Sequence, residues 1–318
     1  MKKGYPSKLR VKRVNVSPYF SSSFVEQETK KINAFENVEY LASNSPEIAN
    51  ILITNTQTQI SQLDKEEIKN CELMIHPNSG YDNFDTNFVT VAHFPIIIGN
   101  PIRSHAVTNY IMSGILSHYS PIPFENEWSK KRFWPRKTLN QLNVLILGEG
   151  HIGSLLKQSL TPLVASLNIY DPFLGKNVFN LENCDVLILA CSLNYSNHHI
   201  INKDVLLKLN HDFLLINAAR GGLVNLLDLI DVLKMKPQAY AILDVFEKEP
   251  FDFSIFKEVQ NITATSHIAG VYSNIDDVTI KFETQVIHDF INLSKEDFKI
   301  QYSKMILNNR VTKEGYLI

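Results

Sequence analysis

Residues 142–171 read LNVLILGEGHIGSLLKQSLTPLVASLNIYD, and this stretch decides the fold class. The short apolar run 143–147 is typical of a buried parallel strand. It leads into GEGHIG at residues 148–153, a G-x-G-x-x-G pattern, and then into a helical pattern whose apolar residues share one face. A second apolar run, 163–170, ends on Asp171. Strand, glycine turn, helix, strand and acid in this order indicate a dinucleotide-binding βαβ unit.

Each part of this unit has a physical role in holding a dinucleotide. Gly148 makes the tight turn, Gly150 lets the backbone approach a pyrophosphate, and Gly153 lets helix and strand pack closely. The N–H groups at the helix start, where His151 and Ile152 lie, are expected to hold the phosphates with the help of the helix dipole.

Asp171 predicts which dinucleotide is bound. A carboxylate at this position accepts hydrogen bonds from the ribose hydroxyls and repels a 2′-phosphate, which favours NAD over NADP. Pro162 is expected to end the intervening helix near Leu160, because proline cannot continue a helix.

Composition sets looser bounds on the chain. Its 318 residues suggest two domains, and 44% hydrophobic with 20% charged residues is ordinary for a globular protein. The net charge of −2 does not call for nucleic acid or an anionic membrane as a partner. Because no signal-like or membrane-length apolar run is present, we expect a cytoplasmic protein. The three cysteines form no ligand-spaced set, so we expect no metal site.

Strand and helix patterns alternate before residue 142, which predicts a small α/β domain ending near Gly99. Strands are expected at residues 11–16, 38–41, 51–54, 73–75 and 96–98, and helices at 24–33, 63–70 and 104–118. Trp128 and Trp134 lie in the irregular segment that follows, and we expect them to form part of a homodimer contact.

The same rhythm resumes after Asp171, and three polar side chains follow three of its strands. Strands are expected at residues 185–190, 213–217, 239–243 and 262–264, with helices at 204–209 and 226–233. Arg220, Glu249 and His267 lie just beyond the last three of these strands. In an open α/β sheet, ligands bind outside the carboxyl ends of the strands, so these three residues are the candidate catalytic groups.

Five motifs in order resemble the D-isomer-specific 2-hydroxyacid dehydrogenases. They are NSGYDNFD at residues 78–85, GEGHIG with Tyr170-Asp171-Pro172, INAARGG at 216–222, LDVFEKEP at 243–250 and SHIAG at 266–270. The resemblance runs from about Leu73 to about Phe290 and includes phosphoglycerate dehydrogenase-like and glyoxylate/hydroxypyruvate reductase-like enzymes.

The resemblance implies an α/β fold of two Rossmann- or flavodoxin-like domains, each a doubly wound parallel sheet. The NAD-binding domain, residues 100–273, would be inserted into a discontinuous substrate domain made of residues 1–99 and 274–318. A helix at about residues 274–293 would complete the substrate domain, while the tail 294–318 matches nothing that we can assign.

The resemblance also implies roles for the candidate residues. Arg220 would bind a 2-oxo acid, His267 would exchange a proton with the substrate oxygen, and Glu249 would hydrogen-bond the imidazole. The backbone around Ser79 and Gly80 would hold the substrate carboxylate. Further cofactor contacts would come from the following residues: Cys191, Ala218, Ala219, Asp244 and His267.

The chain departs from the family pattern at three places. Cys191-Ser192-Leu193 has serine where the family has proline, and only residues 172–184 separate Asp171 from Asp185, where the family has a longer segment. Asn109 replaces the usual acidic residue in the helix after the domain crossing. The first two departures bear on cofactor affinity.

Two functions therefore stand side by side. The first is an NAD(H)-dependent oxidoreductase that interconverts a small 2-oxo acid and its D-2-hydroxy acid. The alternative is a non-enzymatic NAD-binding regulator of the corepressor type. NADH oxidation in the presence of 2-oxo acids would distinguish the two, and the sequence does not identify the 2-hydroxy acid.

Overall fold

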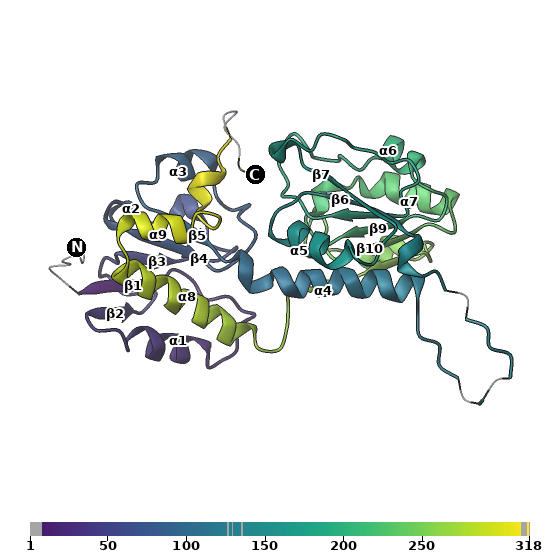
Figure 1. Cartoon of the computed structure of the whole chain (residues 1–318). Coiled ribbons are helices and arrows are strands. Elements are labelled where there is room, and N and C mark those ends of the chain that lie inside the picture. Colours follow the sequence, from purple (N-terminus) through teal and green to yellow (C-terminus); the bar gives the residue numbers. More distant parts are fainter. Residues whose placement is uncertain (1–7, 126, 129, 135, 313–316, 318) are drawn as a thin grey trace. The chain divides into compact units, whose positions relative to one another are not determined.

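The chain forms two compact α/β units. The structure is a computed structural model that describes residues 8–125, 127–128, 130–134, 136–312 and 317. Unit 1 consists of Met1–Arg103 and Tyr272–Ile318, and unit 2 of Ser104–Val271 (Figure 1).

Unit 1 is built on a parallel five-stranded sheet. Its strands are β1 (Leu9–Arg13), β2 (Val38–Leu41), β3 (Ile51–Ile53), β4 (Leu73–His76) and β5 (Ile96–Ile98). Their order in the sheet is β2-β1-β3-β4-β5, the flavodoxin-like order. The sequence placed the first strand, expected at residues 11–16, two residues too late and extended it three residues too far.

Alternate residues of each strand face opposite sides of this sheet. On β3 and β4, Ile53 and Ile75 pack with α1 (Phe24–Ile32), α8 (Ile275–Asn292) and α9 (Lys295–Gln301). Their neighbours Leu52 and Met74 face the opposite core, which includes Val89 of α3 (Thr86–Val91). The smaller α2 (Lys65–Asn70) begins after Asp64, whose carboxylate caps it.

The C-terminal segment completes this unit. Helices α8 and α9, drawn yellow, lie against the sheet together with the N-terminal purple α1 (Figure 1). Val286, Phe290 and Phe298 belong to the same core as β1. The tail that the sequence left unassigned therefore supplies α9 and part of the core of unit 1.

Unit 2 is built on a parallel six-stranded sheet. Its strands are β6 (Asn143–Leu147), β7 (Ser166–Tyr170), β8 (Val186–Leu189), β9 (Leu214–Asn217), β10 (Tyr240–Leu243) and β11 (Ile262–Ala264). Their order is β11-β10-β9-β8-β6-β7. The order reverses between β6 and β8, because β7 lies on one side of β6 and β8 on the other.

Helices cover both faces of this second sheet. Leu156 of α5 (His151–Leu160) and Ile111 of α4 (Asn100–Tyr119) pack on one face. Leu206 of α6 (Lys203–Lys208) and Leu229 of α7 (Leu226–Met235) pack on the other. Helix α5 ends at Leu160, two residues before Pro162. The two-unit α/β fold with doubly wound parallel sheets that the sequence predicts is confirmed.

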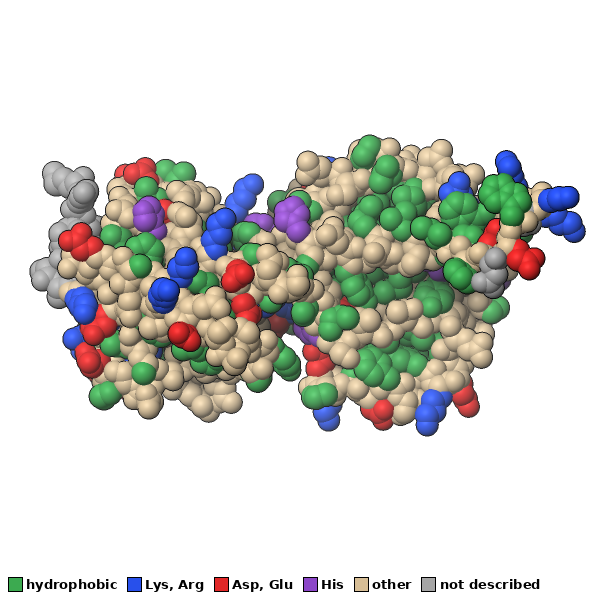
Figure 2. Space-filling view, turned by 90° about the horizontal axis from the view of Figure 1, so that it is seen from below, with side chains coloured by type: hydrophobic (Ala, Val, Ile, Leu, Met, Phe, Trp, Pro, Cys, Tyr) green, Lys and Arg blue, Asp and Glu red, His purple; other side chains and the backbone are tan. Residues whose placement is uncertain are grey.

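Charged side chains are mixed on the face shown in Figure 2. Lysine and arginine side chains lie among aspartate and glutamate side chains on both units. This distribution agrees with the small net charge of the sequence.

Candidate active site

The glycine turn between β6 and α5 requires glycine at two of its positions. Gly148 has φ of 96°, and a β-carbon on it would lie 2.8 Å from Cys191. A β-carbon on Gly153 would lie 2.0 Å from the carbonyl oxygen of Gly148. A side chain at either position would push α5 or the residues after β8 away from the end of β6.

Helix α5 begins in open space. Gly150 is its N-cap, a β-carbon there would contact nothing within 4 Å, and His151 and Ile152 are the first two helical residues. A helix N-terminus without a side-chain cap suits an anion such as a phosphate group. The turn therefore has the chemistry that a dinucleotide pyrophosphate needs.

The glycine turn lies where ligands bind in open α/β sheets. It follows β6, and Cys191 follows β8, and the strand order reverses between these two strands. Burial raises the pKa of the Cys191 thiol to about 12, so this side chain is a neutral wall of the site. Ala218 and Ala219 follow the next strand, β9, and the Ala219 N–H donates to Oδ1 of Asn217 at 3.1 Å.

Asp171 holds the glycine turn from the end of β7. Its Oδ2 accepts a hydrogen bond of 2.8 Å from the N–H of Glu149, in the middle of the turn, and its Oδ1 accepts one of 3.2 Å from the N–H of Phe173. Burial raises the pKa of Asp171. Each carboxylate oxygen has a second lone pair, so the predicted contact with a ribose hydroxyl is compatible with these bonds.

His267 and Glu249 are hydrogen-bonded to each other. Nδ1 of His267 lies 2.8 Å from Oε2 of Glu249, while Oε1 of Glu249 accepts a bond of 2.9 Å from the N–H of Phe246. Both side chains remain open to solvent, with 55% of the His267 side chain and 36% of the Glu249 side chain exposed. The two residues follow the neighbouring strands β11 and β10 and form an accessible imidazole–carboxylate pair.

Asp244 fixes the loop that carries His267. This buried carboxylate accepts hydrogen bonds from the hydroxyl of Thr265 at 2.6 Å and from the N–H groups of Ile268 at 2.7 Å and Ala269 at 2.8 Å. Its own carbonyl accepts from the N–H of His267 at 2.8 Å. His267 has φ of 55°, a left-handed conformation that these bonds on both sides of it maintain.

Arg220 lies in the turn after β9. Its carbonyl accepts a hydrogen bond of 2.9 Å from the side-chain amide of Asn217, and its Nη1 donates to the carbonyl of Ala219 at 2.6 Å. A β-carbon on the next residue, Gly221, would lie 1.9 Å from the carbonyl carbon of Phe246. The arginine turn therefore packs directly on the loop that leads to Glu249.

Unit 1 contains the predicted carboxylate loop, residues 77–80. Nε2 of His76 donates to the carbonyl of Gly80 at 2.8 Å, and Arg103 donates to the carbonyl of Pro77 at 3.1 Å. Ser79 and Gly80 are both half-buried. The structure thus ties the loop down through its carbonyl groups.

Two groups near these residues were not singled out in the sequence, and a third, Asp244, was given a different role. His76, which holds the Gly80 carbonyl, falls at the end of an apolar strand run and gave no separate signal. His198 and His199 contact Glu247 from a different loop, so the chain separation hides their proximity. The sequence analysis gave Asp244 a role in cofactor binding, whereas the structure shows that its carboxylate also hydrogen-bonds the loop that carries His267.

The glycine turn, Asp171 and the three candidate catalytic residues all lie in a segment that matches a known family. Residues 120–269 match the model for the D-isomer specific 2-hydroxyacid dehydrogenase, NAD binding domain. This segment of the chain is therefore similar to the NAD-binding domain of the D-isomer-specific 2-hydroxyacid dehydrogenases. NAD, the cofactor expected from Asp171, is also the cofactor of this domain family.

Curated relatives of this dehydrogenase family resemble the chain at low identity. An erythronate-4-phosphate dehydrogenase of Psychrobacter sp. is 27% identical over 69% of the chain and 60% of its own length. A D-3-phosphoglycerate dehydrogenase of Bacillus subtilis is 24% identical over 88% of the chain and 55% of its own length. The chain therefore spans little more than half the length of these relatives.

Solved structures of the family have the same fold. D-lactate dehydrogenase of Aquifex aeolicus, described as complexed with NAD and lactic acid, matches with a TM-score of 0.67. The alignment covers 94% of this chain and 99% of that one, with 16% sequence identity.

In the part of the chain that the structure describes, no helix has both the length and the apolar character needed to cross a membrane. A shallow hollow of about 630 Å³ in unit 1 is lined by residues that include Thr56, Gln59 and Phe88. The candidate catalytic residues do not line this hollow. We place the functional site at those residues, because their side chains can exchange protons and bind an acid.

Proposed function

We propose that the protein is an NAD(H)-dependent oxidoreductase that interconverts a small 2-oxo acid and the corresponding D-2-hydroxy acid. The observation that supports this most is the 2.8 Å contact between His267 and Glu249 at the carboxyl ends of β11 and β10. The family match supports NAD as the carrier, which supplies hydride when reduced and accepts it when oxidised.

The direction of the His267–Glu249 hydrogen bond assigns the working nitrogen of the imidazole. A carboxylate only accepts hydrogen bonds, so Nδ1 of His267 carries a hydrogen in this pair. The other nitrogen, Nε2, is then the one that exchanges a proton with substrate. During reduction it donates that proton to the oxygen on C2 of the 2-oxo acid, and during oxidation it removes the proton from the hydroxyl.

Arg220 is proposed to bind the substrate. Its guanidinium presents a planar fork of donors that matches a carboxylate and can also polarise the neighbouring carbonyl. It follows β9, next to the strand that precedes Glu249, and its turn packs on the Glu249 loop. Contacts of the substrate carboxylate with Ser79 and Gly80, and a homodimer, remain predictions from the sequence.

The test is a set of variants assayed for NADH oxidation with glyoxylate, hydroxypyruvate, pyruvate and phosphohydroxypyruvate. The preferred change at the acid–base position is His267→Asn, because asparagine tolerates the φ of 55° whereas alanine would be strained there. Its kcat should fall by roughly 10²–10⁴, the range for loss of a general acid–base group, while NADH still binds. Arg220→Lys should raise KM as well as lower kcat, because lysine lacks the fork.

His211→Asn is the matched control, because His211 is an exposed histidine of the same unit outside the candidate site. It should retain wild-type kcat and KM. Wild-type turnover in His267→Asn would refute the assignment of His267. NADH binding without oxidation across the whole panel would instead favour the regulator.

A further inference from the structure

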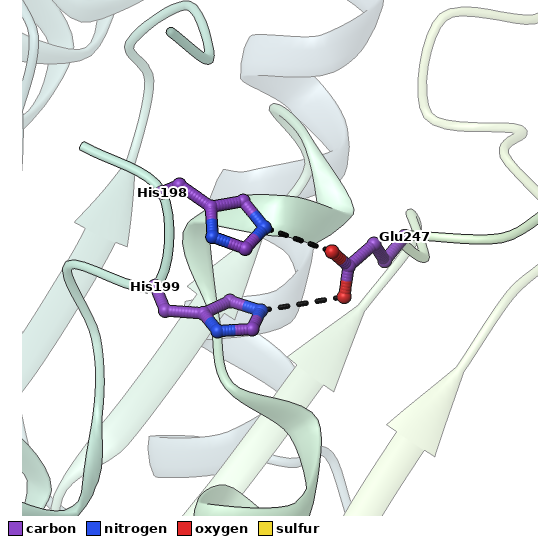
Figure 3. Close-up of side chains that lie close together, drawn as sticks. All are labelled: His198, His199 and Glu247. Carbon is purple, nitrogen blue, oxygen red and sulfur yellow. Dashed lines mark hydrogen bonds and ion pairs between the residues drawn. The ribbon is translucent and has the colours of Figure 1, made fainter. Parts of the chain in front are cut away.

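Two histidines and a glutamate of unit 2 converge outside the His267–Glu249 pair. His198 and His199 lie in the loop between β8 and α6, and Glu247 lies in the loop after β10. Figure 3 shows both imidazole rings directed at the same carboxylate. Nε2 of His198 lies 2.8 Å from Oε1 of Glu247, and Nε2 of His199 lies 3.3 Å from Oε2.

The backbone turns the two neighbouring histidines to the same side. The ring centroids lie 3.8 Å apart with an interplanar angle of 28°, so the imidazoles are stacked. His199 has φ of 53°, a left-handed conformation that a histidine adopts only when its surroundings impose it. Its N–H donates to the carbonyl of Gly222 at 2.8 Å, which holds the residue in this conformation.

The turn at residues 220–222 contacts both the histidine loop and the loop that carries Glu247. Gly222 accepts the hydrogen bond from His199, and the adjacent Gly221 packs against the backbone of Phe246 and Glu247. The loops after β8, β9 and β10 therefore meet at this point, and the ligand atoms are brought together by the fold of unit 2.

The donor set matches one class of cation. Two imidazole nitrogens and one carboxylate oxygen suit Zn²⁺ and similar transition-metal ions, whereas Ca²⁺ and Mg²⁺ prefer oxygen ligands alone. The three ligand atoms lie within 4.8 Å of one another. Bonds of about 2.1 Å to a tetrahedral ion place ligand atoms about 3.4 Å apart. Small rotations of the three side chains would bring their ligand atoms to this spacing.

We propose that Nε2 of His198, Nε2 of His199 and the carboxylate of Glu247 bind a divalent cation of the zinc class, with water in the fourth position. The proposal departs from the absence of a metal site expected from the sequence, and it does not depend on the proposed dehydrogenase activity. A bound ion would link the loop after β8 to the loop after β10, two residues from Glu249.

The experiment measures metal binding to the full chain after removal of metal with a chelator. Co²⁺ serves as the spectroscopic probe, because a tetrahedral Co²⁺ site absorbs visible light, and Zn²⁺ serves as the competitor. We expect one equivalent of Co²⁺ to bind, to give this absorption, and to be displaced by Zn²⁺. Zn²⁺ should also raise the Tm of the wild-type protein, because an ion that binds only the folded state stabilises it.

Two variants keep the fold and remove a ligand. His199→Asn retains a residue that tolerates the left-handed backbone, and Glu247→Gln keeps the size of the side chain. Each should weaken Co²⁺ binding at least tenfold and abolish the Zn²⁺-dependent rise in Tm, with an unchanged Tm in chelator. His211→Asn, an exposed histidine of unit 2 outside the cluster, should bind Co²⁺ as the wild type does. The proposal is overturned if the wild type binds no Co²⁺, or if both variants bind it with wild-type affinity and absorption.

Discussion

At the scale of single residues, Asp171 combines a structural contact with a predicted choice of cofactor. Its Oδ2 holds the N–H of Glu149 in the glycine turn, and its remaining lone pairs are the predicted acceptors for ribose hydroxyls. Lys176 pairs with Asp171 through an isolated β-bridge and forms an ion pair with Glu149. The bridge brings the backbone of Lys176 beside Asp171, while the Lys176 ammonium is paired with Glu149.

Asp171→Ala should narrow the preference for NADH over NADPH, because it removes the carboxylate that repels the 2′-phosphate and leaves Lys176 in place. The measurement is kcat/KM for both cofactors in the wild type and the variant. Asp171→Asn is the companion variant, since its single amide oxygen can keep the hydrogen bond to Glu149 while the charge and the bond from Phe173 are lost. Comparable kcat/KM for the two cofactors in the wild type would contradict the account of Asp171.

His76 is a buried residue whose protonation is linked to stability. Its Nε2 donates to the carbonyl of Gly80, and Nδ1 lies 2.9 Å from the hydroxyl of Thr54. Burial, with a further contribution from the charge of Arg103, lowers the pKa of His76 to about 4. The histidine is therefore neutral in the folded protein at neutral pH.

Acidification between about pH 6.5 and pH 4 should destabilise the wild-type protein through His76. In this window the unfolded chain binds a proton that the folded chain does not, so the free energy of unfolding falls as the pH falls. The full shift is worth about 3 kcal/mol at 1.36 kcal/mol per pKa unit. Between pH 7 and pH 4, the free energy of unfolding measured in urea should fall less in His76→Gln than in the wild type, and the difference should be about this amount.

The control is His93→Gln, at an exposed histidine of unit 1, whose free energy of unfolding should fall between pH 7 and pH 4 as much as that of the wild type. A fall in His76→Gln equal to that of the wild type would disprove the linkage.

At the scale of secondary-structure elements, the sequence predicted best where a buried parallel strand ends in a special turn. The strand at residues 143–147 and the end of α5 at Leu160 lie where the apolar run, the glycines and Pro162 place them. Strand β1 was predicted at residues 11–16 but spans Leu9–Arg13, and no local pattern reveals that its Arg13 is buried in an ion-paired cluster. Helix α9 was missed because its burial depends on a core formed by distant strands.

In the candidate site, too, some features could be predicted from the sequence and others could not. Arg220, Glu249 and His267 could be singled out because each follows a strand of one parallel sheet. The hydrogen bonds by which Asp244 holds the His267 loop could not be predicted, because they come from residues that follow the next strand. The cluster of His199 and Glu247 was hidden for a similar reason, since 48 positions separate the two residues and neither lies in a ligand-spaced motif.

At the scale of the whole molecule, unit 1 depends on chain segments from both ends. The fully buried Arg13 of β1 forms ion pairs with Glu28 of α1 and with Glu283 of α8. Burial raises the pKa of the Glu283 carboxyl well above its usual range. Removal of α8 would leave a buried charge pair and an apolar sheet face exposed to water.

Residues 1–99 expressed alone should therefore fail to fold cooperatively, which would support the proposed discontinuous substrate domain. Circular dichroism and urea unfolding of the fragment provide the measurement. Supplying residues 272–318 in trans should restore a cooperative transition, because this segment contributes α8 and α9. A monomeric 1–99 fragment with cooperative unfolding would count against the discontinuous domain.

Isotope transfer measures directly whether the protein moves hydride between NAD and C2 of a 2-oxo acid. NADH carrying deuterium at both C4 positions of the nicotinamide would be incubated with the wild-type protein and the 2-oxo acid of the panel that it reduces fastest. We expect deuterium at C2 of the product, which should be the D enantiomer for every acid of the panel except glyoxylate, whose product has no D form, and we expect this label transfer to be slower in His267→Asn by roughly 10²–10⁴. A product without deuterium at C2, or no product from any acid of the panel, would contradict it.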